Sequence, residues 1–474
     1  MAFRKYDPNP VAKAKIDWDR EHMVHWVYPI GLNCGFIMDH ADGISYYDSE
    51  GFQIYDGSSQ LMCVELGYRK EYMEEVAAVA SEQLKKLPMA TNFWGMVNDA
   101  TVAAGQELQK IVPEGLDAFW FAPGGGEAVE SALQVCRWYW KNQGTQKYKF
   151  ISLENCYHGM YWGTATASKV GRGEFSNYMA PMVPGFLAAP DYYCYRCTLN
   201  HKYPECGIEC VKQIDKIIQM EDKETVAGVI VEVEHGTAGS VPSPREYLPM
   251  LREICDRNEV SLIVDEVMTG FGRCSEGAGN AFACQITGVT PDFMTMAKGI
   301  TSAYIPLGAV AITREIADGL EGHFTSGPTY AAHPVSCAVA AKVMEIYQRD
   351  RIFEHAAKVG AYAKQQIQER LIDTSPIAQS VTGYGLLLGI ELAKDKETGE
   401  DYPPESHKMM RVQDRALDKG LYIRVCDKSF APGNRFVFAP PLVTTEAEVD
   451  AMIDILDETL KEELASEYAE GSRA

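Results

Sequence analysis

Short apolar runs alternate with helical patterns along the middle of the chain. The runs are FWFA, KFISL, AGVIVEVE, SLIVDEV, DFMTMA and LGAVAI, and each has the length of a buried strand. Strands that alternate with helices predict a mostly parallel sheet with helices on both faces. We therefore expect residues 75–330 to form a large α/β domain.

The two flanking regions show different patterns. Residues 1–74 contain the strand and turn signals of GISYYDSEGFQIYDGSS, and residues 331–474 contain helical patterns at 340–371, 405–419 and 445–468. The C-terminal region also contains the strand-like stretches GLLLGIELA and RFVFA. We expect both regions to join in a smaller α+β domain and the polar end ASEYAEGSRA to fray.

Composition and charge narrow the class of protein. The chain has 474 residues, of which 46% are hydrophobic, so a large core is available. Its 44 basic and 66 acidic residues give a net charge of −22, which would repel nucleic acid and anionic lipid surfaces. The N-terminus has no apolar signal segment, and no run is long enough to span a membrane. We expect a cytoplasmic protein without nucleic-acid or membrane partners.

Four of the thirteen cysteines are clustered in YYCYRCTLNHKYPECGIEC, at Cys194, Cys197, Cys206 and Cys210. A C-x2-C pair followed by a C-x3-C pair offers four thiolates to zinc, although the second spacing departs from the commonest pattern. Free, paired or reversibly oxidised thiols fit the same segment. In each case the cluster is structural, and we expect no metal in the catalytic site.

A glycine-rich turn follows the first strand-like run. The stretch FAPGGGEAVESAL places Gly124, Gly125 and Gly126 directly before a helical pattern. Backbone N–H groups at such a helix start can hold an anion. The spacing matches neither G-x-x-x-x-G-K-[ST] nor G-x-G-x-x-G, so the turn alone leaves a nucleotide, a cofactor phosphate and a plain helix start open.

Two charged residues follow strand-like runs, where ligands of open α/β sheets gather. Asp265 ends SLIVD, and Lys298 follows DFMTMA. A lysine among apolar residues can lose its proton and attack a carbonyl, and a carboxylate can keep a pyridine nitrogen protonated. Singly, the two fit a helix cap and a solvated lysine. Together with the glycine turn they indicate a site for pyridoxal phosphate.

Over nearly its whole length the chain resembles the class III (ω-type) aminotransferases, which are pyridoxal-phosphate enzymes of fold type I. The resemblance lies in LIVDEVMTGFGR, TMAKG, CYHGMYWGT and GPTYAAHPVSCAVAA. It implies a mostly parallel seven-stranded sheet in the large domain. It also implies a homodimer or a dimer of dimers, with active sites shared between subunits.

The resemblance also implies roles for single residues around the cofactor ring. Lys298 would be the Schiff-base lysine that also moves a proton, and Asp265 would contact the pyridine nitrogen. Val267 and Tyr157 would cover the two faces of the ring, with His158 beside Tyr157. Taken singly, such residues also fit core or turn positions.

Two departures from the family pattern concern the phosphate and a nearby turn. The family usually has Ser-Gly-Ser or Ser-Gly-Thr where this chain has Gly124–Gly126, so backbone N–H groups must replace two hydroxyl donors. The usual Glu-Pro is Glu232-Val233 here, which keeps a carboxylate near Asp265 or the cofactor.

The resemblance also implies that Thr329 reaches the phosphate bound by the neighbouring subunit.

The substrate positions favour an uncharged donor. Family members that use α-amino acids often have an arginine and a gating glutamate where this chain has Val437 and Thr237. A charged group of the donor would find no partner at Val437 or Thr237, and an unpaired buried charge is costly. GLYIRV resembles the stretch of amine:pyruvate transaminases that carries a mobile arginine, which implies that Arg424 binds the keto acid. Arg435 is the competing candidate, and both also fit ordinary strand-end charges.

We therefore expect a ping-pong aminotransferase that moves an amino group from an ω-amino acid or simple amine to pyruvate. Racemases or epimerases, phospho-lyases and a decarboxylase have the same cofactor residues and are the alternatives. A non-catalytic binding protein would require Lys298 to be merely solvated. Trp94 is the expected substrate contact, and Met62, Tyr161 and Trp162 are further candidates for the pocket wall.

Overall fold

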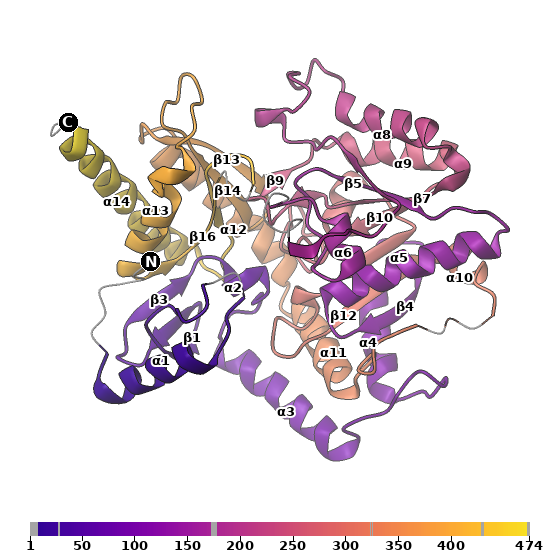
Figure 1. The fold of residues 1–474 in the computed structure, drawn as a ribbon. Helices are drawn as coiled ribbons and strands as arrows, with labels where there is room; N and C mark the ends of the chain where they lie inside the picture. Colours follow the sequence, from indigo (N-terminus) through magenta and orange to yellow (C-terminus); the bar gives the residue numbers. More distant parts are fainter. Residues whose placement is uncertain are drawn as a thin grey trace.

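A seven-stranded sheet lies at the centre of the larger part of the computed structural model (Figure 1). The structure describes residues 8–26, 29–171, 178–322, 324, 326–427 and 431–471. The strand order is β4-β12-β11-β10-β7-β5-β6. The strands span Leu116–Ala122 (β4), Lys149–Leu153 (β5), Phe186–Ala189 (β6), Val226–Val231 (β7), Ser261–Asp265 (β10), Phe293–Met296 (β11) and Gly308–Thr313 (β12).

The predicted mostly parallel sheet is confirmed. Strand β12 runs antiparallel to β4 and β11, and the other neighbouring pairs are parallel. Strand β6 (Phe186–Ala189), with the sequence FLAA, was not among the predicted runs. The position of β6 at the edge of the sheet leaves the predicted centre unchanged.

Helices cover both faces of this sheet because its central strands are apolar on both faces. Ile230, Ile263 and Phe293 belong to the core cluster of α5 (Gly125–Asn142). Their neighbours Val229 and Leu262 belong to the cluster on the other face. That face is covered by α4 (Asp99–Gln109), α8 (Glu209–Met220) and α9 (Tyr247–Asn258), and α11 (Pro334–Arg349) packs against α4.

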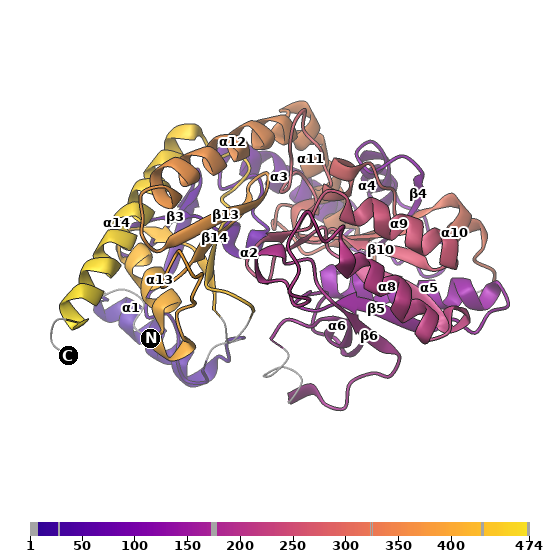
Figure 2. The same ribbon diagram turned by 90° about the horizontal axis from the view of Figure 1, so that it is seen from above.

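The first and last parts of the chain meet beside this sheet. Strands β1 (Met38–Asp42), β2 (Ser45–Asp48) and β3 (Gln53–Asp56) form one sheet with β15 (Leu421–Tyr422). A second sheet contains β13 (Ala378–Tyr384), β14 (Leu387–Leu392), β17 (Arg435–Phe438) and β16 (Arg424–Cys426). Figure 2 shows α2 (Ser59–Met62) between the C-terminal strands and the central sheet. Ser58 and Ser59 there donate hydrogen bonds to the carbonyls of Val437 and Ala439.

Two helix predictions at the C-terminal end were wrong in extent. The pattern at 340–371 is divided into α11 and α12 (Ile352–Ile367), because Arg351 has φ 53°, which no α-helix accommodates. The last helix, α14 (Glu446–Gly471), runs past residue 468 into the stretch expected to fray. Residues 472–474 of that stretch lie outside the described part.

The remaining elements are short or peripheral. They are α1 (Pro10–His22), α3 (Lys70–Lys86), α6 (Trp162–Ala167), α10 (Arg314–Asp318), α13 (Lys408–Asp418), β8 (Glu234–His235), β9 (Val241–Pro242), the 3-10 turns Cys194–Arg196, Lys223–Thr225, Ala283–Thr287, Lys298–Ile300 and Pro404–Ser406, and the π-turn Gln368–Ile372. Among the helices of the described residues, none combines the length and apolar character needed to cross a membrane.

Candidate active site

Three donors orient the buried carboxylate of Asp265 at the end of β10. Its side chain is 4% exposed. Oδ1 accepts hydrogen bonds from Oγ1 of Thr295 at 2.9 Å and from the backbone N–H of Val267 at 3.1 Å. Oδ2 lies 2.7 Å from Nδ1 of the fully buried His158. Because β10 and β11 are parallel neighbours in which Asp265 pairs with Thr295, the sheet register itself supplies one donor.

The charge of His158 supports this arrangement. Burial alone would lower its pKa, but Cys156 and the hydrogen bond to Asp265 outweigh burial and raise the pKa well above its usual value. A protonated His158 donates its Nδ1 hydrogen to Oδ2 of Asp265. Nε2 of His158 is buried and has no hydrogen-bond partner among the described residues.

Lys298 follows β11 in an unusual backbone conformation. Its φ is 44°, and non-glycine residues in this region are often held there at functional sites. Within the described part of the chain, its amine makes no hydrogen bond or ion pair. Burial lowers the pKa of Lys298, whereas Cys63 and Asp265 act in the opposite direction. The chain thus holds an amine that loses its proton more easily than an ordinary lysine.

The glycine turn begins α5 and lies close to the strand ends. Gly124 is the N-cap with an extended backbone, α5 starts at Gly125, and no side chain of the described residues caps the helix. The first N–H groups of a helix have no partner within it. A Cβ on Gly125 would lie 2.8 Å from Cγ1 of Val267, and one on Gly126 would lie 2.8 Å from the ring of Tyr161. A side chain at Gly125 would have to displace Val267, and one at Gly126 would have to displace the exposed ring of Tyr161.

Glu232 connects the Tyr157 segment to the strand end of β7. Its Oε2 accepts a hydrogen bond from the backbone N–H of Tyr157 at 3.0 Å and lies 3.0 Å from Nδ1 of His235. The ring of Tyr157 is half-buried and packs against Val170 and Ala238. Burial raises the pKa of Tyr157, and the nearby carboxylates of Asp265 and Glu232 raise it further.

The two arginines considered for substrate binding differ sharply. Arg435 is 1% exposed, pairs with Glu391 at 2.7 Å and also donates to the carbonyls of Gly239 and Ser240. Those contacts occupy its guanidinium within the core. We therefore assign Arg435 a structural position.

Arg424 is half-buried and lies on β16 directly opposite Val437 of β17. Its guanidinium donates to the carbonyls of Gly236 and Thr237, at 3.3 Å and 2.7 Å. Burial lowers the pKa of Lys298, and the positive charge of Arg424 lowers it further. The positive charge of Arg424 therefore lies on the strand next to Val437, and its hydrogen-bond partners are backbone carbonyls.

Two predicted residues lie at the surface of the single chain. Trp94 is 79% exposed and packs beside Phe93, with ring centroids 6.4 Å apart. Thr329 is exposed next to Tyr330, which is 65% exposed. A Cβ on Gly327 would lie 3.4 Å from Phe93, so the two exposed segments are neighbours. Both residues therefore lie on the outside of the single chain.

The other suggested pocket residues are divided between core and surface. Met62 is buried at 1% exposure, whereas Tyr161 and Trp162 are 51% and 57% exposed. Tyr161 donates to Oε1 of Glu127 at 2.9 Å, at the first turn of α5.

Sequence reasoning missed three residues that shape the site. Thr295 donates to Asp265, Ser58 accepts the backbone N–H of Arg424 at 2.8 Å, and Cys63 acts on the pKa of Lys298. Thr295 carried a signal, because it is a lone polar residue in the buried run FMTM. Ser58 and Cys63 come from a distant segment and carried none.

The site fits pyridoxal phosphate. The glycine turn leaves an unfilled helix start beside Val267, which suits a phosphate. Asp265 is a carboxylate held in a fixed orientation, which could pair with a protonated ring nitrogen, and Lys298 is an amine without a partner among the described residues. These three features lie at the ends of β4, β10 and β11.

Comparison with known proteins agrees with this geometry. Residues 30–460 match the sequence profile of the family Aminotransferase class-III. An adenosylmethionine-8-amino-7-oxononanoate aminotransferase of Geobacter sulfurreducens is 30% identical over 461 residues, covering 94% of this chain and 96% of the relative. A putrescine–pyruvate aminotransferase of Pseudomonas aeruginosa is 31% identical over 444 residues, covering 91% and 92%.

The fold is also found in solved structures. An amine transaminase from an uncultivated Pseudomonas species, solved with pyridoxal phosphate bound, superposes with a TM-score of 0.82. The two sequences are 30% identical, and the match covers 90% of this chain and 95% of that one.

Proposed function

The chain belongs to the class III aminotransferases, and we propose that it moves an amino group from an ω-amino acid or simple amine to pyruvate. The enzyme has the fold of type I pyridoxal-phosphate transaminases and uses that cofactor. The arrangement of Arg424, Val437 and Thr237 is the observation that supports the choice of substrates.

Pyridoxal phosphate, when bound, carries the amino group between the two half-reactions and withdraws electrons from the carbon that bears it. We assign the phosphate to the helix start at Gly124–Gly126 and the ring nitrogen to Asp265. Thr295 and His158 hold the Asp265 carboxylate in place. Lys298, whose pKa burial lowers, takes a proton from the substrate carbon and returns it. Val267 and Tyr157 would cover the two faces of the ring, and Glu232 fixes the backbone of Tyr157.

The acceptor is recognised through its carboxylate. Arg424 is a cation whose partners are the carbonyls of Gly236 and Thr237, so a substrate carboxylate offers it a stronger, charge-assisted hydrogen bond. The donor binds in its turn with its uncharged part toward the position where α-amino-acid enzymes carry an arginine and this chain has the apolar Val437, which lies in the core opposite Arg424. A relative named for putrescine and pyruvate is consistent with this pairing.

We propose that the site is completed in a homodimer, in which Thr329 contacts the phosphate bound by the neighbouring subunit and Trp94 lines the substrate pocket. The exposed aromatic residues Phe93, Trp94 and Tyr330 support a contact between chains at this surface. All thirteen cysteines are unpaired, which favours a reducing compartment and hence the cytoplasm.

The experiment supplies purified holoenzyme with a panel of ω-amines and α-amino acids, and with pyruvate or 2-oxoglutarate as acceptor. We expect alanine and an aldehyde to form in equal amounts from an ω-amine and pyruvate. A racemase or epimerase would instead return the amino acid with its configuration changed and the cofactor unaltered. Faster reaction with glutamate or ornithine than with any ω-amine would contradict the proposed donor.

A further inference from the structure

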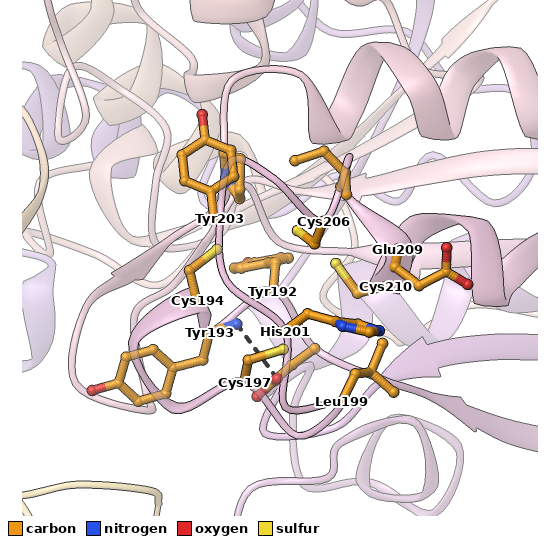
Figure 3. Close-up of a pocket in the computed structure, with 13 residues that line it drawn as sticks. Tyr192, Tyr193, Cys194, Cys197, Leu199, His201, Tyr203, Cys206, Glu209 and Cys210 are labelled. Carbon is orange, nitrogen blue, oxygen red and sulfur yellow. Dashed lines mark hydrogen bonds between the residues drawn. The ribbon is translucent and has the colours of Figure 1, made fainter.

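The four clustered cysteines surround one cavity. Cys194 begins a 3-10 turn after β6, Cys206 ends the following loop, and Cys210 lies in the first turn of α8. Figure 3 shows their sulfur atoms and that of Cys197 pointing toward a common space. The same cavity is lined by His201, and Cys194, Cys197 and Cys206 all lie within electrostatic range of Cys210.

This convergence differs from the packing of the other cysteines. Cys136, Cys156 and Cys426 are buried, and each thiol donates to a backbone carbonyl. The clustered thiols are exposed at Cys194 and only partly buried at the other three positions, and none forms a disulfide. Packing therefore explains the buried thiols but not why four thiols of one segment point at a single space.

We propose that Cys194, Cys197, Cys206 and Cys210 bind one structural Zn²⁺ ion. Zinc prefers four ligands in a tetrahedron, four thiolates satisfy it, and pairs of cysteines on neighbouring turns are a common way to supply them. Among the described residues, no group of three His, Cys, Asp or Glu side chains already has the geometry of a metal-ligand set. Binding therefore draws the four sulfurs inward, to about 2.3 Å from the ion.

The ion would brace a loop that joins the central sheet to the C-terminal part. Tyr193 donates to Oε2 of Glu391 on β14, and Arg196 pairs with Oε1 of the same carboxylate at 2.6 Å. Glu391 also pairs with Arg435 at 2.7 Å. On the other side, the hydroxyl of Tyr192 donates to the carbonyl of Glu232 at 2.9 Å. With four protein ligands the ion has no open position, so its role is structural.

The test is the metal content of wild-type protein purified with a reductant and without added metal. We expect about one zinc ion per chain by mass spectrometry. The variant Cys194→Ser/Cys197→Ser should lose nearly all of it, and Cys34→Ser, outside the cluster, should retain it. After zinc removal, cobalt(II) should restore a tetrahedral thiolate spectrum in the wild type alone. A chelator should lower the unfolding temperature of the wild type but not of the double variant.

Three results would overturn the proposal, and each can be obtained with wild-type protein if the double variant fails to fold. The first is protein that contains no zinc and gives no thiolate spectrum with cobalt(II). The second is protein that contains iron and labile sulfide in place of zinc. The third is a count of fewer than thirteen reactive thiols in protein purified without a reductant and then unfolded. The last result would indicate disulfides. None of these readouts depends on transaminase activity, so they stand or fall separately from the proposed function.

Discussion

Replacing Arg424 with alanine tests the proposed mode of acceptor recognition. Arg424 lies opposite Val437 on the neighbouring strand. Its positive charge adds to the effect of burial in lowering the pKa of Lys298. Its hydrogen bonds go to the carbonyls of Gly236 and Thr237. Alanine removes the positive charge but leaves β16 intact, because the strand pairs through its backbone.

The expected effect follows from the hydrogen bonds gained and lost. A hydrogen bond to a charged group contributes about 1.5–3 kcal/mol, which corresponds to about 10- to 150-fold in kcat/KM. Arg424 must give up its contacts of 3.3 Å and 2.7 Å to Gly236 and Thr237 when it turns to the substrate. This exchange reduces the gain, so we expect a loss near the lower limit, about tenfold.

The assay compares pyruvate with propanal, an acceptor of the same length without a carboxylate, at a fixed ω-amine concentration. In Arg424→Ala, kcat/KM for pyruvate should fall about tenfold, while the value for propanal and the half-reaction with the amine should change little. Arg245→Ala, which removes an arginine that is 60% exposed and pairs with Glu276, is the matched control. Equal losses for both acceptors, or an unchanged preference for pyruvate, would refute the reasoning.

Three further outcomes are expected. Asp265→Asn should still bind some cofactor but lose about a hundredfold or more in kcat, because a neutral amide cannot keep the ring nitrogen protonated; near-normal turnover would show that Asp265 has another role. Dilution of the enzyme to monomers should release cofactor and activity together, and Thr329→Ala should weaken cofactor binding in the dimer, whereas a fully active monomer would contradict a shared site. Because burial lowers the pKa of Lys298, the rate of cofactor capture by the apoenzyme should rise with pH through a midpoint below that of an ordinary lysine. Asp265→Asn should lower this midpoint further, since the Asp265 carboxylate raises the pKa of Lys298. A midpoint at the pKa of an ordinary lysine would contradict the effect assigned to burial.

The central sheet was predictable because its signal is local. Each central strand is an apolar run of the right length, and Asp265 and Lys298 directly follow two of these runs. Parallel neighbours end at the same edge, so their proximity followed from the order of the runs. The break between α11 and α12 was not predictable, because nothing in the helical pattern shows that Arg351 adopts φ 53°.

The contacts between distant segments were beyond the sequence. Ser58 holds the backbone of Arg424 across 366 positions, and Arg273 donates to Ser59 across 214. Such pairs depend on how the N-terminal segment folds against the C-terminal strands, which no local periodicity encodes. The structural position of Arg435 likewise became evident only from its pairing with Glu391.

Identifying the lysine that carries the cofactor tests the account most directly. The holoenzyme is reduced with borohydride, which fixes the cofactor to the amine to which it is joined, and the labelled peptide is sequenced by mass spectrometry. We predict label at Lys298 alone, and a Lys298→Ala protein that is unlabelled and inactive. Label at another buried lysine, such as Lys147 or Lys169, or normal turnover by Lys298→Ala, would contradict the assignment of this site.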